Sequence, residues 1–167
     1  THVAGIVAAA SNNGTGIAGV SWGAKILPVK VLDRNGSGFD SQVAAGIIWA
    51  ADQGAKVINL SLGGQEVDPI LESAIVYAQN KGALVVAAAG NGGDPNTYSR
   101  NGCSYHNPDM YPAAYANVLA VGAVDNYNLR ASFSEYRSYV DVVAPGVSVL
   151  STFPKTASFY GYEYSYY

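Results

Sequence analysis

The sequence predicts an α/β fold of three layers, in which helices cover both faces of a mostly parallel β-sheet. Short runs rich in Val, Ile and Ala alternate along the chain with longer segments of helical periodicity. The runs are apolar almost throughout, which is typical of strands buried on both faces. The connections between runs and helical segments are short, and this favours right-handed β-α-β crossovers.

The first elements are predicted from apolar composition and from helix start and stop signals. Residues 2–10 are apolar and rich in Ala, and we expect a helix there. A strand is predicted over 25–32. The next helix is predicted over 42–53, with Ser41 as its N-cap and Gly54 directly after it, the position where helices commonly end.

The following elements have clear boundaries. A predicted strand over 56–62 leads directly into two glycines. Asp68 and Pro69 are an N-cap and a proline at the first helical position, so they predict a helix over 70–81 that Gly82 terminates. Further strands are predicted over 83–89, 117–124 and 139–145, with a long irregular segment over 90–110.

Composition excludes several classes of function. A chain of 167 residues is the size of one domain. Charged residues are 13% of the chain and the net charge is −3, so no basic surface is available for nucleic acid or anionic lipid. No apolar run reaches the roughly 18 residues that span a bilayer. The single cysteine, Cys103, excludes an intrachain disulfide.

Two predicted strands end in glycine-rich sequences, Ser61-Leu62-Gly63-Gly64 and Gly90-Asn91-Gly92-Gly93. The glycines can simply turn the chain, and Asn can begin a turn. Ligands of parallel sheets bind beyond the carboxyl ends of strands, however, and an amide N–H held there can stabilise a developing oxyanion. Both interpretations fit. A nucleotide-binding α/β domain is disfavoured, because no strand is followed by the Gly-x-Gly-x-x-Gly spacing.

Four stretches in consecutive order carry a resemblance to a known family. They are THVAGIVAAASNNGTGIAGV, VINLSLGG, VVAAAGNGG and VDVVAPGVSVLSTFP. In this order they resemble the subtilisin-like serine proteases (subtilases), and most closely their thermitase-like branch. The resemblance covers nearly the whole chain apart from part of the segment 93–110. It implies a secreted, monomeric endopeptidase that cleaves polypeptides through an acyl-enzyme.

The resemblance places the catalytic triad outside these residues. The family's catalytic histidine is the first in His-Gly-Thr-His-Val-Ala-Gly, so His2 matches the second, non-catalytic one. The aspartate is expected further upstream, and the nucleophilic serine in a Gly-Thr-Ser-Met-Ala motif after Tyr167. Residues 1–167 are therefore expected to be the central part of one peptidase catalytic domain, truncated at both ends and inactive alone.

Within the chain, the resemblance implies binding roles. Asn91 matches the amide of the oxyanion hole. Ser61 is assigned to binding and not to nucleophilic attack, and we expect His106, near Cys103, to be a solvated loop histidine because no third group orients such a pair. The small pocket walls predict bulky apolar or aromatic side chains at the residue before the cleaved bond. The residues matched to substrate binding are Gly36, Ser37, Gly38, Ser61, Leu62, Gly63, Ala88, Ala89 and Gly90.

The resemblance also implies structural calcium. Asn13, Thr15 and Ile17 match a calcium loop whose two carboxylates are expected outside the chain, and hard oxygen ligands suit Ca²⁺. The carbonyls of a weaker second cation site match Ala113, Tyr115 and Val118. The alternative to an active protease is a catalytically dead relative that only binds peptides. Neither nucleic acid nor a membrane is expected as a partner.

Overall fold

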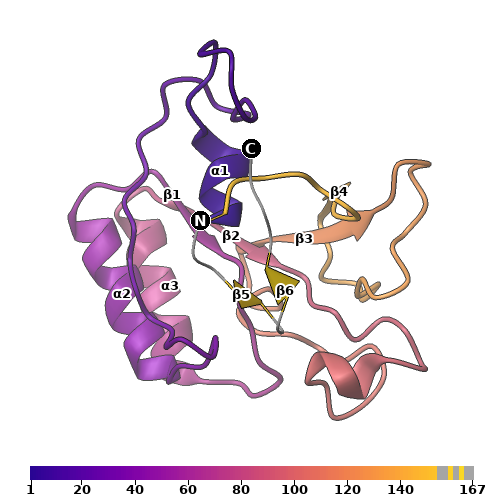
Figure 1. Ribbon diagram of the computed structural model, residues 1–167. Helices are drawn as coiled ribbons and strands as arrows, with labels where there is room; N and C mark the ends of the chain where they lie inside the picture. The colour runs from indigo at the N-terminus through magenta and orange to yellow at the C-terminus, as the bar shows by residue number, and fades with distance from the viewer. Residues whose placement is uncertain (154–157, 160–161, 164–167) are drawn as a thin grey trace. The chain divides into compact units, whose positions relative to one another are not determined.

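A computed structural model describes residues 1–153, 158–159 and 162–163 (Figure 1). The chain divides into two units, one of Val29–Ser148 and one of Thr1–Pro28 together with Val149–Tyr167. The helices and strands of the first unit are α2 (Asp40–Asp52), β1 (Val57–Leu60), α3 (Pro69–Asn80), β2 (Leu84–Ala88), the 3₁₀ helix η1 (Tyr98–Asn101), β3 (Leu119–Val124) and β4 (Val142–Pro145).

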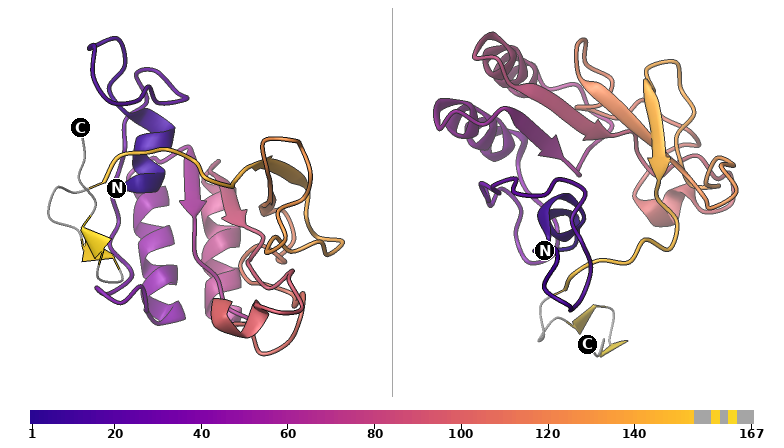
Figure 2. Two further views of the ribbon diagram at one scale, coloured as in Figure 1. Left: turned by 45° about the vertical axis from the view of Figure 1, so that its right-hand side comes forward. Right: turned by 90° about the horizontal axis from the view of Figure 1, so that it is seen from above.

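The first unit is built on a parallel sheet of four strands in the order β1-β2-β3-β4. Leu60 lies opposite Ala87 in the first pair, and Ala88 lies opposite Val121 in the second. Helices α2 and α3 lie side by side (Figures 1 and 2). The predicted α/β class with a parallel sheet is confirmed.

One face of the sheet packs against these two helices. The strand residues on this face alternate along the chain, as the period of a strand requires. Small alanines on both the sheet and the helices allow close approach. The buried core includes Ile58, Leu60, Val85 and Ala87 from the strands and Val43, Ile47, Leu71, Ala74, Ile75 and Ala78 from the helices.

Helix α3 (Pro69–Asn80) lies within one residue of the predicted boundaries, 70–81. The Asp68 carboxylate accepts hydrogen bonds from the backbone N–H groups of Ile70 at 2.7 Å and Leu71 at 3.0 Å. Two donors of the first turn are thereby satisfied. Gly82 follows the helix with a φ of 83°, a left-handed conformation in which a side chain would be strained.

Two local predictions are wrong. Helix α2 begins at Asp40 and not after Ser41, because the N-cap is Phe39, whose N–H donates to Gln42 Oε1 at 3.4 Å. The predicted strand over 25–32 is absent from the described secondary structure. Pro28 has no N–H to donate to a ladder and lies at the junction of the two units.

The second unit contains α1 (His2–Ala8) and the two-stranded antiparallel pair β5 (Ser158–Phe159) and β6 (Tyr162–Glu163). Helix α1 is shorter than the predicted 2–10. The Ser151 hydroxyl donates to the carbonyl of His2 at 2.6 Å. Among the residues that the structure describes, no helix is both long enough and apolar enough to cross a bilayer.

Candidate active site

The two glycine-rich segments lie together at one edge of the sheet. Residues 61–63 directly follow β1, and residues 89–91 directly follow β2. The two strands are parallel neighbours in register, so their carboxyl ends meet at the same edge. This edge is where a parallel sheet places its ligands.

Met110 lies between these two segments. A Cβ built on Gly63 would come within 3.7 Å of Met110 Cε, and one built on Gly90 would come within 2.6 Å of Met110 Cγ. The adjacent residue, Tyr111, exchanges backbone hydrogen bonds with Gly64 at 2.8 and 2.7 Å. Met110 thus forms an apolar floor between the segments. It was missed in the sequence because it belongs to the segment that departs from the family.

The Tyr139 hydroxyl ties this floor to the neighbouring segment. It donates to the carbonyl of Ala89 at 2.8 Å and accepts the N–H of Met110 at 3.3 Å. Burial raises the pKa of Tyr139, so its hydroxyl stays protonated and can make both bonds over the ordinary pH range.

Asn91 is exposed, whereas Gly92 and Gly93 directly after it are buried. The Asn91 carbonyl accepts a hydrogen bond from Asn101 Nδ2 at 2.7 Å. Its side-chain amide makes no hydrogen bond within the part of the chain that the structure describes. The backbone is therefore held while the amide remains available to a ligand.

Glu135 lies beneath this segment and is only 2% exposed. Its Oε1 accepts the Gly92 N–H at 2.8 Å, and its Oε2 has no hydrogen-bond partner among the described residues. Burial raises the pKa of Glu135, an effect that the bond from Gly92 partly offsets. Burial also raises the pKa of the nearby Cys103 thiol. No sequence pattern singled out Glu135, because its partner Gly92 lies 43 residues away along the chain.

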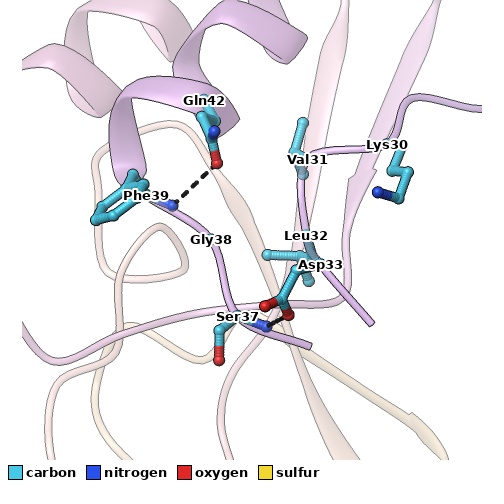
Figure 3. Close-up of a pocket in the computed structure, with 8 residues that line it drawn as sticks. All are labelled: Lys30, Val31, Leu32, Asp33, Ser37, Gly38, Phe39 and Gln42. Atoms are coloured by element: carbon cyan, nitrogen blue, oxygen red, sulfur yellow. Dashed lines mark hydrogen bonds between the residues drawn. The ribbon is translucent and has the colours of Figure 1, made fainter. Parts of the chain in front are cut away.

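Two residues of the predicted second binding segment 36–38, Ser37 and Gly38, line a pocket of about 510 Å³ at the start of α2 (Figure 3), whereas Gly36 is not among its lining residues. Asp33 shapes its loop by accepting the backbone N–H groups of Asn35 at 2.8 Å and Ser37 at 3.0 Å. These bonds lower the pKa of Asp33. The residues lining the pocket are Lys30, Val31, Leu32, Asp33, Ser37, Gly38, Phe39 and Gln42.

Gly38 and Gly63 both expose backbone that a peptide could use. Neither the N–H nor the C=O group of these two glycines makes a hydrogen bond within the described chain. No hydrogen bond joins the segments 36–38 and 61–63 directly in that same part of the chain. Both segments therefore keep backbone donors and acceptors free at the positions predicted to bind substrate.

Neither of the two histidines belongs to a catalytic triad among the described residues. His2 Nε2 lies 3.2 Å from the carbonyl of Val149, and His106 Nε2 lies 3.1 Å from the carbonyl of Gly93. The Ser61 hydroxyl accepts the side-chain amide of Asn59 at 2.9 Å and has no histidine partner. Ser61 therefore lacks the base that activates a nucleophile.

The residues predicted for cation binding supply only neutral oxygens. Asn13 Oδ1 accepts the Thr15 N–H at 3.2 Å, so it already closes its own turn. At the second site the Tyr115 carbonyl accepts the Val118 N–H at 3.3 Å. No group of three or more His, Cys, Asp or Glu suited to a metal occurs in the described residues. Ca²⁺ usually takes six to eight oxygen ligands, about twice what either set offers.

Known proteins are similar to this chain in sequence and in fold. The model of the subtilase family matches residues 1–165. The chain is 56% identical over 152 residues to "Thermophilic serine proteinase" of Bacillus sp. (strain AK1) and 52% identical over 156 residues to "Thermitase" of Thermoactinomyces vulgaris. These alignments cover 91% and 92% of this chain but only 35% and 51% of the relatives. The chain thus spans between about a third and half of their length.

A solved structure has the same fold. It is titled "Proteases from Pseudoalteromonas arctica PAMC 21717", is 38% identical and aligns with a TM-score of 0.76 over 93% of this chain and 45% of its own. The parallel sheet, the glycine-rich strand ends and the match along 165 residues agree. One of the relatives is named as a serine proteinase, and the chain belongs to the subtilase family.

Proposed function

We propose that this chain is the substrate-binding part of a secreted serine endopeptidase, with the triad contributed by other parts of the same protein. The relatives it matches are about twice its length or more, which leaves room for those parts.

The observation that carries the proposal is the state of Asn91. The residue is exposed at the carboxyl edge of the sheet and its amide has no hydrogen-bond partner among the described residues, while its carbonyl is fixed by Asn101. A serine hydroxyl that attacks a peptide carbonyl leaves negative charge on the carbonyl oxygen. An N–H donor fixed in advance stabilises that charge and costs no reorganisation during the reaction. Asn91 would be this donor.

Substrate would bind as an extended strand. The free backbone groups of Gly38 and Gly63 would pair with the peptide on its two sides, which is β-strand addition. The side chain before the cleaved bond would lie between residues 61–63 and 88–90, against Met110. Because methionine is apolar and flexible, this lining supports the expected preference for bulky apolar or aromatic side chains.

The experiment is the replacement Asn91→Ala in the complete protein, with Asn126→Ala as the matched control at an exposed asparagine. We expect kcat for a chromogenic peptide to fall by about 10²–10³-fold, which is the loss that removal of an oxyanion donor causes in another subtilisin-like protease. The control should keep kcat. An unchanged kcat in Asn91→Ala would overturn the role of Asn91.

Two further outcomes test the division of the active site. Residues 1–167 expressed alone should hydrolyse no chromogenic peptide, and turnover that a serine-directed reagent blocks would show that the triad lies within them. If the complete protein binds peptides but turns none over, the catalytically dead relative becomes the better interpretation.

Calcium would be structural and not catalytic. Asn13, Thr15 and Ile17 offer oxygens of the right kind but too few, so carboxylates from elsewhere in the protein would complete the site. Chelation should lower the unfolding midpoint of the complete protein, and Asn13→Ala should reduce that decrease. If chelation lowers the unfolding midpoint of Asn13→Ala as much as that of the wild type, Asn13 is not a calcium ligand. Ala113, Tyr115 and Val118 would supply carbonyls to the weaker second site.

A further inference from the structure

One peptide group beside the candidate oxyanion donor is held at both of its polar atoms. The carbonyl of Asn91 accepts Asn101 Nδ2 at 2.7 Å, and the N–H of Gly92 donates to Glu135 Oε1 at 2.8 Å. The next carbonyl, that of Gly92, accepts the N–H of Asn107 at 2.7 Å. Rotation of the peptide between Asn91 and Gly92 would break the two bonds from side chains at once.

Glu135 is itself fixed in place. It is almost fully buried, and its own N–H points to the carbonyl of Gly90 at 3.4 Å. Its close approach requires the glycine at 92, because a Cβ there would lie 2.6 Å from Oε1. Glu135 therefore contacts the backbone both before and after Asn91.

We infer that Asn101 and Glu135 are positioning residues for the Asn91 amide. This inference rests on the proposed role of Asn91. The Asn91 side chain has no hydrogen bond of its own in the described chain, so its location depends on the backbone that carries it. A donor stabilises an oxyanion only when it lies within about 2.7–3.1 Å of that oxygen. Loosening the peptide after Asn91 would spread the amide over positions outside this range.

The first test is Asn101→Ala in the complete protein, with Ser99→Ala as its control. Both positions lie in η1 and are exposed, but the Ser99 side chain makes no hydrogen bond in the described chain. We expect Asn101→Ala to lower kcat by about 3- to 10-fold, the equivalent of one hydrogen bond, with KM within about 2-fold of the wild type. A rise in KM at constant kcat would overturn the inference.

The double variant with Asn91→Ala separates positioning from a general structural role. If Asn101 acts through Asn91, then Asn101→Ala should change kcat by less than about 2-fold once Asn91 is alanine. The same loss in both backgrounds would overturn the inference. If Asn91→Ala alone leaves kcat unchanged, the proposed function fails first, so the two failures are distinguishable.

Glu135 is tested by a pair of replacements. Gln keeps an acceptor for the Gly92 N–H, whereas Ala removes it. Glu135→Gln should keep kcat within about 2-fold, and Glu135→Ala should lower it by about 3- to 10-fold at unchanged KM. Equal kcat in the two variants would overturn the role of Glu135. Should Glu135→Ala fail to fold, Glu135→Gln and the Asn101 variants still decide the question.

Discussion

Replacement of Gly92 by alanine is the most direct test of the packing beneath the candidate oxyanion donor. The new Cβ would lie 2.6 Å from Glu135 Oε1, 2.8 Å from Cys103 Sγ and 2.8 Å from Pro108 Cδ. These three neighbours are buried, so none can turn out into solvent. Overpacking of this kind costs about 1–3 kcal/mol, and weakening the bond from the Gly92 N–H adds about 1 kcal/mol. We expect the free energy of unfolding to fall by about 2–4 kcal/mol.

The matched control is Gly64→Ala, at the glycine beside the other strand end. A Cβ there meets no atom of the described residues within 4 Å, and its φ is not positive. It should therefore be neutral, or stabilising by up to about 1 kcal/mol through the unfolded chain. The assay is equilibrium unfolding in guanidinium chloride, with a serine protease inhibitor present to prevent self-digestion. Equal free energies of unfolding for the two variants, within about 0.5 kcal/mol, would refute the packing argument.

Three more predictions concern stability and pH. Asp68→Ala removes the acceptor of two N–H groups at the start of α3 and should lower the free energy of unfolding by about 1 kcal/mol. Asp68→Asn keeps an acceptor oxygen and should retain most of the wild-type stability, as measured by denaturant unfolding. Burial raises the pKa of Glu135, so ionisation of this carboxyl lowers the stability of the folded protein as pH rises through that pKa, and the loss is absent below about pH 4.3, where the carboxyl is protonated in the unfolded chain too. The stability of Glu135→Gln relative to the wild type should therefore be greater at pH 8 than at pH 4. An equal difference between variant and wild type at both pH values would contradict this. Tyr139→Phe leaves the N–H of Met110 without its partner and should lower the unfolding free energy by about 1–2 kcal/mol, and no loss would mean that water replaces the hydroxyl.

Local signals predicted the elements that local interactions determine. Asp68, Pro69 and Gly82 bound α3 because the cap, the proline and the positive φ act within a few residues of one another. The apolar runs predicted the strands for a similar reason, because the composition of a strand is a property of the few consecutive residues that form it. The strand over 25–32 failed because a strand needs a hydrogen-bonded partner, which its own sequence does not specify.

The candidate site was predictable only where the family motifs reach. Asn91 and the glycines follow the pattern of the family, and the structure places residues 61–63 and 89–91 at the same edge of the sheet. Asn101 and Glu135 were not predicted, because they contact residues 91 and 92 from positions 10 and 43 residues away. Contacts of that kind depend on the path of the irregular segment, which no periodicity describes.

The change from an exposed Asn91 to a buried Gly92 has a consequence for isotope exchange. The amide hydrogen of Gly92 is bonded to a buried carboxylate, so it should exchange with deuterated water only when the segment around Glu135 opens. The side chain that we propose as the oxyanion donor would lie in water one residue away from an amide that is protected in this way. The exposed Asn91 side chain would thus be attached to backbone that moves as little as the buried interior.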